Sequence, residues 1–296
     1  MKTFPGSGRH ARAPFVVLAL LFVLIQPAAV PGVAGQVVAA QGPADLTGRW
    51  EIDFRRTDGR VDLNLENRRG RQHFDGVVPL ADLQGLSCSV VEAGGDVAFR
   101  LERPAGVLHF EGEVQRRYGD GTFRFVADAG FEEALLQLGY DRPHADEALV
   151  LAVQGADLAF ARDLKGIDPG RLDTEDLVKA AIFDITPAYA AEMRALGFDR
   201  LSLDDLVKMR IFDVDADLVA AFAEMGYPVR DVEDLVKARA HDIDADFVRE
   251  ARGLGFEPTL DELVQMKIFD VDRTFVEDLA AAGYRDLSLD ELVQFR

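Results

Sequence analysis

Apolar and polar residues alternate with a period of two between residues 45 and 128. Such alternation places one face of each strand in a core and the other face in water. Short segments rich in glycine, proline and aspartate separate the alternating runs, as expected of turns. The region therefore predicts a small antiparallel β domain of about six or seven strands. The apolar positions that define the strands are Trp50, Ile52, Phe54, Val61, Leu63, Leu65, Val97, Phe99, Leu101, Leu108, Phe110, Phe123 and Phe125.

A second pattern recurs in residues 123–296, with a period of 28 or 29 residues. Each unit has a residue suited to a helix N-cap and then an apolar stripe. In most units a glycine–aromatic pair such as Gly197-Phe198 then ends the first helix, and a second capped helix follows. Helices of about ten residues bury too little apolar surface alone, so successive units have to stack. The units recur at Leu149, Leu177, Leu206, Leu235, Leu263 and Leu292.

Together the two patterns predict an α+β fold with two domains. The first is the antiparallel β domain at residues 45–128. The second, at residues 123–296, is an α-helical repeat solenoid of about six helical hairpins.

The N-terminal residues 1–40 have the order of a secretory signal peptide. Lys2 and Arg9 are basic, an unbroken apolar run occupies residues 15–25, and small residues follow as far as Ala40. The apolar run is shorter than the roughly 20 residues that a spanning helix needs. We therefore expect a cleaved signal peptide and a periplasmic or secreted protein without a membrane span in its mature chain. An uncleaved N-terminal membrane anchor is the alternative.

The net charge of −19 arises entirely from residue 129 onward, where 37 acidic residues oppose 18 basic ones. A negative field repels nucleic acid and anionic lipid headgroups and favours cationic or neutral partners. We expect a protein or peptide partner and no nucleic acid. The alternative is a solvated acidic surface that has no charged partner.

The single cysteine, Cys88, lies in the apolar stretch 86–91. A free cysteine in such a stretch is predicted to be a small buried hydrophobic residue. One thiol excludes an internal disulfide, so packing has to hold the fold together.

No motif for catalysis or for a cofactor is present in the sequence. The histidines are scattered, and no zinc-spaced pair, P-loop, Rossmann fingerprint or nucleophile elbow occurs. A weak calcium candidate combines Asp213, Asp215, Asp217 and Glu224. An EF-hand loop needs glycine at its sixth place, where Leu218 stands inside the predicted helix. Helix capping by aspartate explains these acids better.

A column of basic residues recurs at the ends of the second helices. It could line one edge of the helices and recognise carboxylates. The alternative is pairing with the helix dipole and with acidic neighbours. The column consists of Lys208, Arg210, Lys237, Arg239, Lys267 and Arg296.

Two resemblances add to this picture. Gly48-Arg49-Trp50 resembles the opening of lipocalin-like barrels, which implies a ligand-holding barrel as the alternative to a small filled sheet with Trp50 as a core residue. Residues 186–211 resemble the helical repeats of exported bacterial proteins and those that trail some beta-lactam-sensor-type membrane metallopeptidases. This second resemblance covers about residues 95–296 and brings no catalytic residues, because the His-Glu-x-x-His signature is absent.

The sequence therefore predicts a non-catalytic, exported protein-interaction module. One alternative is a small-ligand carrier that uses the β domain. Another is an accessory or regulator of a membrane metallopeptidase signalling system, which rests on analogy. The oligomeric state stays open.

Overall fold

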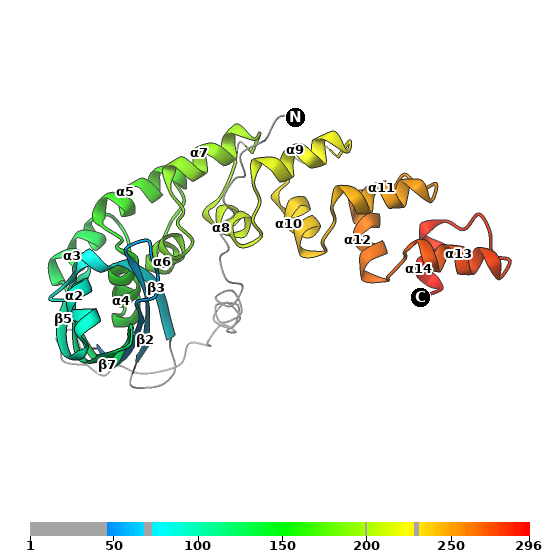
Figure 1. Cartoon of the computed structure of the whole chain (residues 1–296). Helices are drawn as coiled ribbons and strands as arrows, with labels where there is room; N and C mark the ends of the chain where they lie inside the picture. Colours follow the sequence, from blue (N-terminus) through cyan, green and yellow to red (C-terminus); the bar gives the residue numbers. More distant parts are fainter. Residues whose placement is uncertain (1–45, 68–72, 199, 228–230) are drawn as a thin grey trace, which may run out of the picture. The chain divides into compact units, whose positions relative to one another are not determined.

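A computed structural model describes residues 46–67, 73–198, 200–227 and 231–296. The predicted signal peptide lies outside the described residues. The fold is α+β and divides into two compact units. One unit holds a curled antiparallel sheet that ends at Ala127, and the other holds the helices from Asp128 onward (Figure 1).

The sheet contains seven strands in the order β3-β2-β1-β7-β6-β5-β4. Strand β1 pairs with both β2 and β7, so Trp50 lies opposite Leu65 on one side and Gly121 on the other. The short helices η1 (Leu80–Asp82) and α2 (Cys88–Ala93) flank β4. The strands are β1 (Leu46–Asp53), β2 (Arg60–Asn67), β3 (His73–Pro79), β4 (Leu83–Gln84), β5 (Gly95–Arg103), β6 (Gly106–Gln115) and β7 (Tyr118–Ala127).

Trp50 is a core residue of the sheet, as predicted. Its side chain is only 1% exposed, and its Nε1 donates a hydrogen bond to the carbonyl of Glu111 at 3.2 Å. Three glycines, Gly112, Gly119 and Gly121, lie against the indole. A Cβ atom on any of them would come within 2.8 to 3.0 Å of it. The indole thus fills the space that these glycines leave. The residues around it are Gly112, Gly119, Gly121, Phe99 and Phe110.

Two predictions for this region need correction. Cys88 is exposed, because the apolar stretch forms the short helix α2, of which only Val91 is buried. Residues 123–127, which the two predicted regions shared, belong to β7. The first helix of the second unit has Asp128 as its N-cap.

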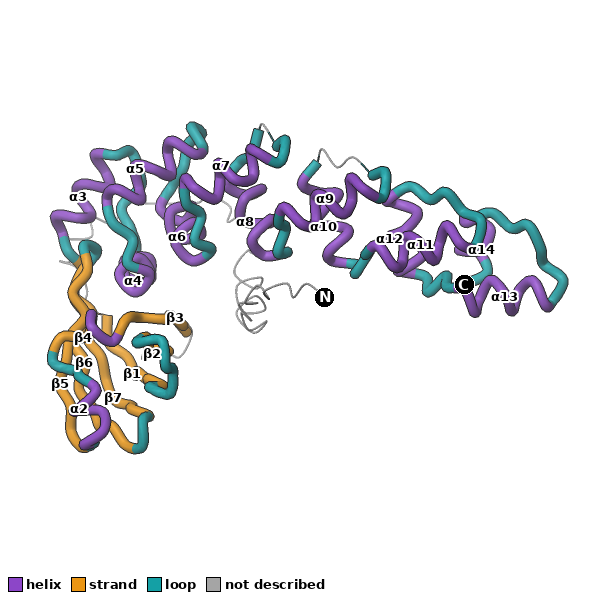
Figure 2. The backbone as a smooth tube through the Cα atoms, turned by 45° about the horizontal axis from the view of Figure 1, so that its top comes forward, coloured by secondary structure: helices purple, strands orange, loops and turns teal. Residues whose placement is uncertain are grey.

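The second unit consists of helices that alternate along the chain between first helices (odd numbers) and second helices (even numbers). Successive second helices contact one another from α4 to α14, and the first helices α3, α5 and α7 do the same. Figure 2 shows the two rows for α3 to α8. The helices are α3 (Ala129–Gln137), α4 (Ala145–Gln154), α5 (Leu158–Ile167), α6 (Thr174–Ile182), α7 (Pro187–Ala195), α8 (Leu203–Ile211), α9 (Ala216–Glu224), α10 (Val232–Ala240), α11 (Ala245–Gly253), α12 (Leu260–Ile268), α13 (Arg273–Ala281) and α14 (Leu289–Gln294).

Glycines follow the first helices at the predicted places and have positive φ angles between 81° and 102°. Such angles are strained for residues that carry a Cβ atom, which explains the choice of glycine. The exception is α5, which ends in an extended Asp168 and so matches the degenerate unit of the sequence. The glycines are Gly139, Gly197, Gly226, Gly255 and Gly283.

Four residues connect each second helix from α6 to α12 to the next first helix, and the last three of them are here called the hairpin link. In the link at 213–215, Asp213 has a φ of 47°, Val214 is 3% exposed, and Asp215 caps α9 by accepting a hydrogen bond from the amide of Leu218 at 2.8 Å. The amide of Val214 returns to the carbonyl of Met209 at 2.8 Å, which closes the end of α8. The other links are 184–186, 242–244 and 270–272.

Candidate functional site: a pocket between α7 and α8

The arginines of the predicted binding edge are engaged within their own hairpins. Arg210 donates from Nη2 to the carbonyl of Asp184 at 3.2 Å, and its guanidinium lies 3.6 Å from the ring centroid of Tyr189. Arg239 donates to the carbonyl of Asp213 at 3.1 Å. These carbonyls belong to the positive-φ aspartates of the links. The same arrangement recurs for Arg296, which donates to Asp270 at 2.7 Å and lies over Phe275.

The lysines of the predicted edge also have partners. Lys208 forms an ion pair with Glu233, whose hydrogen bond raises the pKa of the lysine. Lys237 pairs with Asp261 at 3.0 Å. These two pairs join successive second helices, α8 to α10 and α10 to α12. The remaining lysine, Lys267, lies 4.2 Å above the ring of Phe247.

Recognition of a partner's carboxylates stays a prediction for this edge, and all six of its side chains contact neighbouring helices or hairpin links. The reason is that long cationic side chains lie next to carboxylates and to carbonyls at the helix ends, and they satisfy those groups first.

The weak calcium candidate is built from helix ends. Asp213 occupies the positive-φ position of a hairpin link, and the carboxylate of Asp215 caps α9 by accepting a hydrogen bond from the amide of Leu218. Asp217 lies in the first turn of α9, and Glu224 is its last residue. Within the described parts of the chain, no group of three or more His, Cys, Asp or Glu side chains could hold a metal ion.

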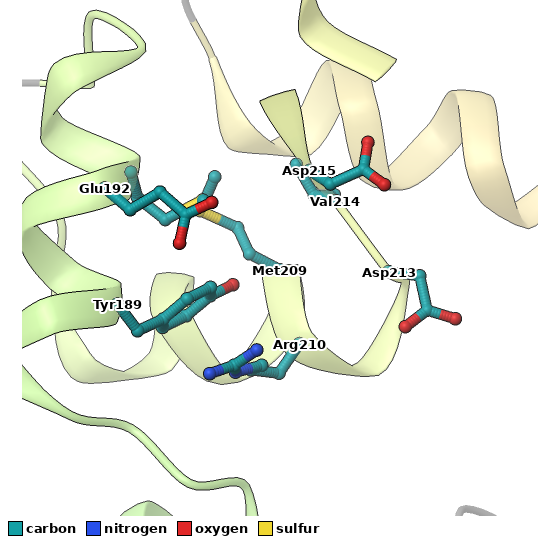
Figure 3. Close-up of a pocket in the computed structure, with 8 residues that line it drawn as sticks. Tyr189, Glu192, Met209, Arg210, Asp213, Val214 and Asp215 are labelled. Atoms are coloured by element: carbon teal, nitrogen blue, oxygen red, sulfur yellow. The ribbon is translucent and has the colours of Figure 1, made fainter. Parts of the chain in front are cut away.

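A pocket of about 130 Å³ lies between α7, α8 and the hairpin link that follows them (Figure 3). Helix α7 supplies a tyrosine, a carboxylate and a methionine, and α8 supplies a methionine and an arginine. The link adds two carboxylates and a valine. The lining residues are Tyr189, Glu192, Met193, Met209, Arg210, Asp213, Val214 and Asp215.

Among the described residues, two buried polar atoms at this pocket have no hydrogen-bond partner, Tyr189 Oη and Arg210 Nε. Tyr189 is only 5% exposed, and its hydroxyl points into the space that Glu192, Met209 and Arg210 surround (Figure 3). Burial raises the pKa of Tyr189 to about 12, so the phenol keeps its proton at neutral pH. It can therefore both donate and accept a hydrogen bond.

The hydroxyl of Tyr189 is also an exception among the first helices. Tyr189 is the third residue after its N-cap, Thr186. The corresponding residues of the other first helices are aromatic or aliphatic and carry no polar atom. They are Phe131, Phe160, Leu218, Phe247 and Phe275.

Carboxylates outnumber the single cation of the pocket. The side-chain carboxylates of Glu192 and Asp213 have no hydrogen-bond or ion-pair partner among the residues that the structure describes. Arg210 is held by the Asp184 carbonyl and lies 3.9 Å from its carboxylate. The remaining wall is apolar. None of the eight lining residues is a serine, threonine, cysteine or lysine.

Neither protein-family models, curated proteins nor solved structures give a match to this chain. Among the described helices, none combines the length and apolarity needed to cross a membrane. The pocket itself was not predicted from the sequence. The signal that could have revealed it is the tyrosine at position 189, where the other first helices carry phenylalanine or leucine.

Proposed function

We propose that residues 128–296 form a helical repeat solenoid and that this solenoid is an exported protein-interaction module. The observation that carries the proposal is the contact of each second helix with the next, from α4 to α14. Helices that contact mainly their neighbours in the chain leave one side of every unit free for a partner.

The contacts between hairpins support the same proposal. Arg194 of α7 donates to the carbonyl of Ile167 in α5 at 2.8 Å. Arg252 of α11 donates to the carbonyl of Met225, the C-cap of α9, at 2.8 Å. Such bonds tie one hairpin to the next rather than to a distant element. The acidity of this half of the chain favours a partner with basic or neutral character.

The alternatives find no support among the described residues. A small-ligand carrier would need a cavity within the sheet, but Trp50 and two phenylalanine rings occupy the space above its glycines. The link to a metallopeptidase system rests on the resemblance alone.

Crosslinking in cells tests the interaction proposal. A photo-crosslinking residue replaces Asp204 or Asp217 on the helices, and Glu92 or Ala98 on the sheet unit serves as the matched exposed control. The expected result is a discrete protein adduct from the helical positions and none from the controls. An adduct that forms only from the sheet unit, or no adduct at all, contradicts the proposal.

Export is proposed from residues 1–40. Cell fractionation should place the protein outside the cytoplasm, and N-terminal sequencing should find a mature end after Ala34, Gly35 or Ala40. An intact N-terminus in a membrane fraction would instead identify an anchor.

A further inference from the structure

We propose that the pocket between α7 and α8 receives the side chain of a lysine presented by a basic protein partner. This proposal rests on the proposed interaction function and assigns a particular place and chemistry to it. Four properties of the pocket lead to a lysine: its size, its charge, its unpaired hydroxyl and its apolar wall.

The size of the pocket fits one side chain. Small-molecule pockets usually enclose about 300–1,000 Å³, whereas this one encloses about 130 Å³. At roughly 30 Å³ per water molecule, that is room for about four waters. Met193, Met209 and Val214 provide an apolar wall against which the methylene stem of a lysine can lie.

The charge of the pocket selects a cation. The carboxylates of Glu192 and Asp213 lie at the pocket without partners among the described residues, and the link adds Asp215. An ammonium group has three donors and no acceptor, which suits a pocket lined by carboxylate and hydroxyl oxygens. Arg210 opposes this charge only in part, because its guanidinium also lies 3.9 Å from the Asp184 carboxylate. The unpaired carboxylates disfavour an anionic ligand.

The unpaired hydroxyl of Tyr189 gives an independent argument for a ligand. A buried polar group without a partner costs about 1–3 kcal/mol. The other five first helices avoid this cost by carrying phenylalanine or leucine at the corresponding place. A ligand that donates to Tyr189 Oη removes the cost when it binds, and an ammonium group is such a donor. A peptide partner also carries main-chain carbonyls, which are acceptors of the kind that Arg210 Nε lacks.

The test measures binding of the full-length protein to a fluorescein-labelled peptide of alternating lysine and alanine, by fluorescence anisotropy. A peptide with glutamine in place of lysine is the ligand control. Glu192→Gln and Tyr189→Phe are the test variants. Glu250→Gln is the matched control, because Glu250 occupies on α11 the place that Glu192 occupies on α7 and its substitution changes the net charge equally.

We expect the lysine peptide to bind and the glutamine peptide not to bind. Glu192→Gln should weaken binding about tenfold, since charge pairs that lose water on binding are worth a few kcal/mol. Tyr189→Phe should weaken it about threefold to tenfold, as loss of one hydrogen bond does. Glu250→Gln should change it less than about twofold, because Glu250 does not line the pocket.

Three outcomes overturn the proposal. The first is equal weakening by Glu192→Gln and Glu250→Gln, which would mean that the peptide responds to the general acidic field. The second is absence of binding by the lysine peptide. The third is displacement of the peptide by spermidine at the same concentration, which would make the site one for free polyamines. In each case an adduct from Asp204 or Asp217 would leave the interaction function standing.

Discussion

The side chains at the ends of the second helices show how one residue type can carry several structural tasks. Arg210 stacks on Tyr189 and binds a carbonyl of the preceding hairpin link. The corresponding Arg239 donates to the carbonyl of Asp213 in the same way, although Leu218 occupies in its hairpin the place that Tyr189 has in the preceding one. The period of these arginines was visible in the sequence, but their acceptors were not. The acceptors are main-chain carbonyls of aspartates that have positive φ angles.

Tyr189→Phe should make the protein more stable. The substitution removes a buried hydroxyl without a partner and keeps the ring under Arg210. The free energy of unfolding should rise by about 1 kcal/mol, measured by urea denaturation followed by circular dichroism. Tyr140→Phe is the control with the opposite expectation, because Tyr140 Oη donates to the carbonyl of Ala161 at 2.8 Å. A loss of stability in both variants would show that Tyr189 Oη has a partner in solution.

The same tyrosine should make stability depend on alkaline pH. Burial raises the pKa of Tyr189 from its ordinary value near 10 to about 12. Between these values the unfolded chain releases the phenolic proton and the folded protein keeps it, so the free energy of unfolding falls as pH rises. Because Tyr189→Phe lacks this proton, its stability advantage over the wild type should grow from pH 9 to pH 11. If the variant and the wild type differ in stability by the same amount at pH 9 and pH 11, the pKa of Tyr189 is not raised by burial.

The helices and strands were largely predictable because their signals are local. The alternation of apolar and polar residues predicts the strands. Aspartate, serine and threonine N-caps mark the starts of the helices, and glycines such as Gly197 mark the ends of first helices. What failed depended on packing between elements. Cys88 lies in an apolar run but on the exposed side of a short helix, and the acids at 213–217 resemble a metal loop although they terminate and begin helices.

The hairpin link should tolerate glycine and reject a β-branched residue at its first position. Asp242 has a φ of 49°, a conformation that costs a β-branched residue about 1–2 kcal/mol. Asp242→Val should therefore lower the free energy of unfolding by about that amount, whereas Asp242→Gly should change it by less than about half as much. Thermal melts followed by circular dichroism compare the two variants. Equal losses would show that the aspartate carboxylate, rather than the backbone, is what matters.

At the scale of the whole molecule, the proposed solenoid consists of similar helical hairpins. Its length should therefore be adjustable by removing one complete hairpin. Removing residues 214–242 joins Asp213 to Ile243 and recreates a link of the same composition. It also places Asp261 where Glu233 stood, so Lys208 keeps a carboxylate across the new junction. The shortened chain should fold with helical circular dichroism and a cooperative melt.

A deletion that is not a whole unit is the control, for instance residues 206–220, which joins the first turn of α8 to the second half of α9 and removes the buried residues Leu206 and Met209. The control should aggregate or lose cooperativity. If both deletions have the same effect on folding and on the cooperativity of the melt, the hairpins are not interchangeable. The contacts between hairpins would then depend on their individual sequences.

Trp50 provides an intrinsic fluorescence probe of the sheet unit. It is the only tryptophan in the chain, and it is buried among phenylalanine rings in the sheet. Its emission should therefore be blue-shifted in the native protein and move to longer wavelength only when the sheet opens. The far-ultraviolet signal, in contrast, comes mainly from the helices. Unlabelled samples can thus reveal whether a partner that stabilises the helical unit leaves the melting of the sheet unchanged.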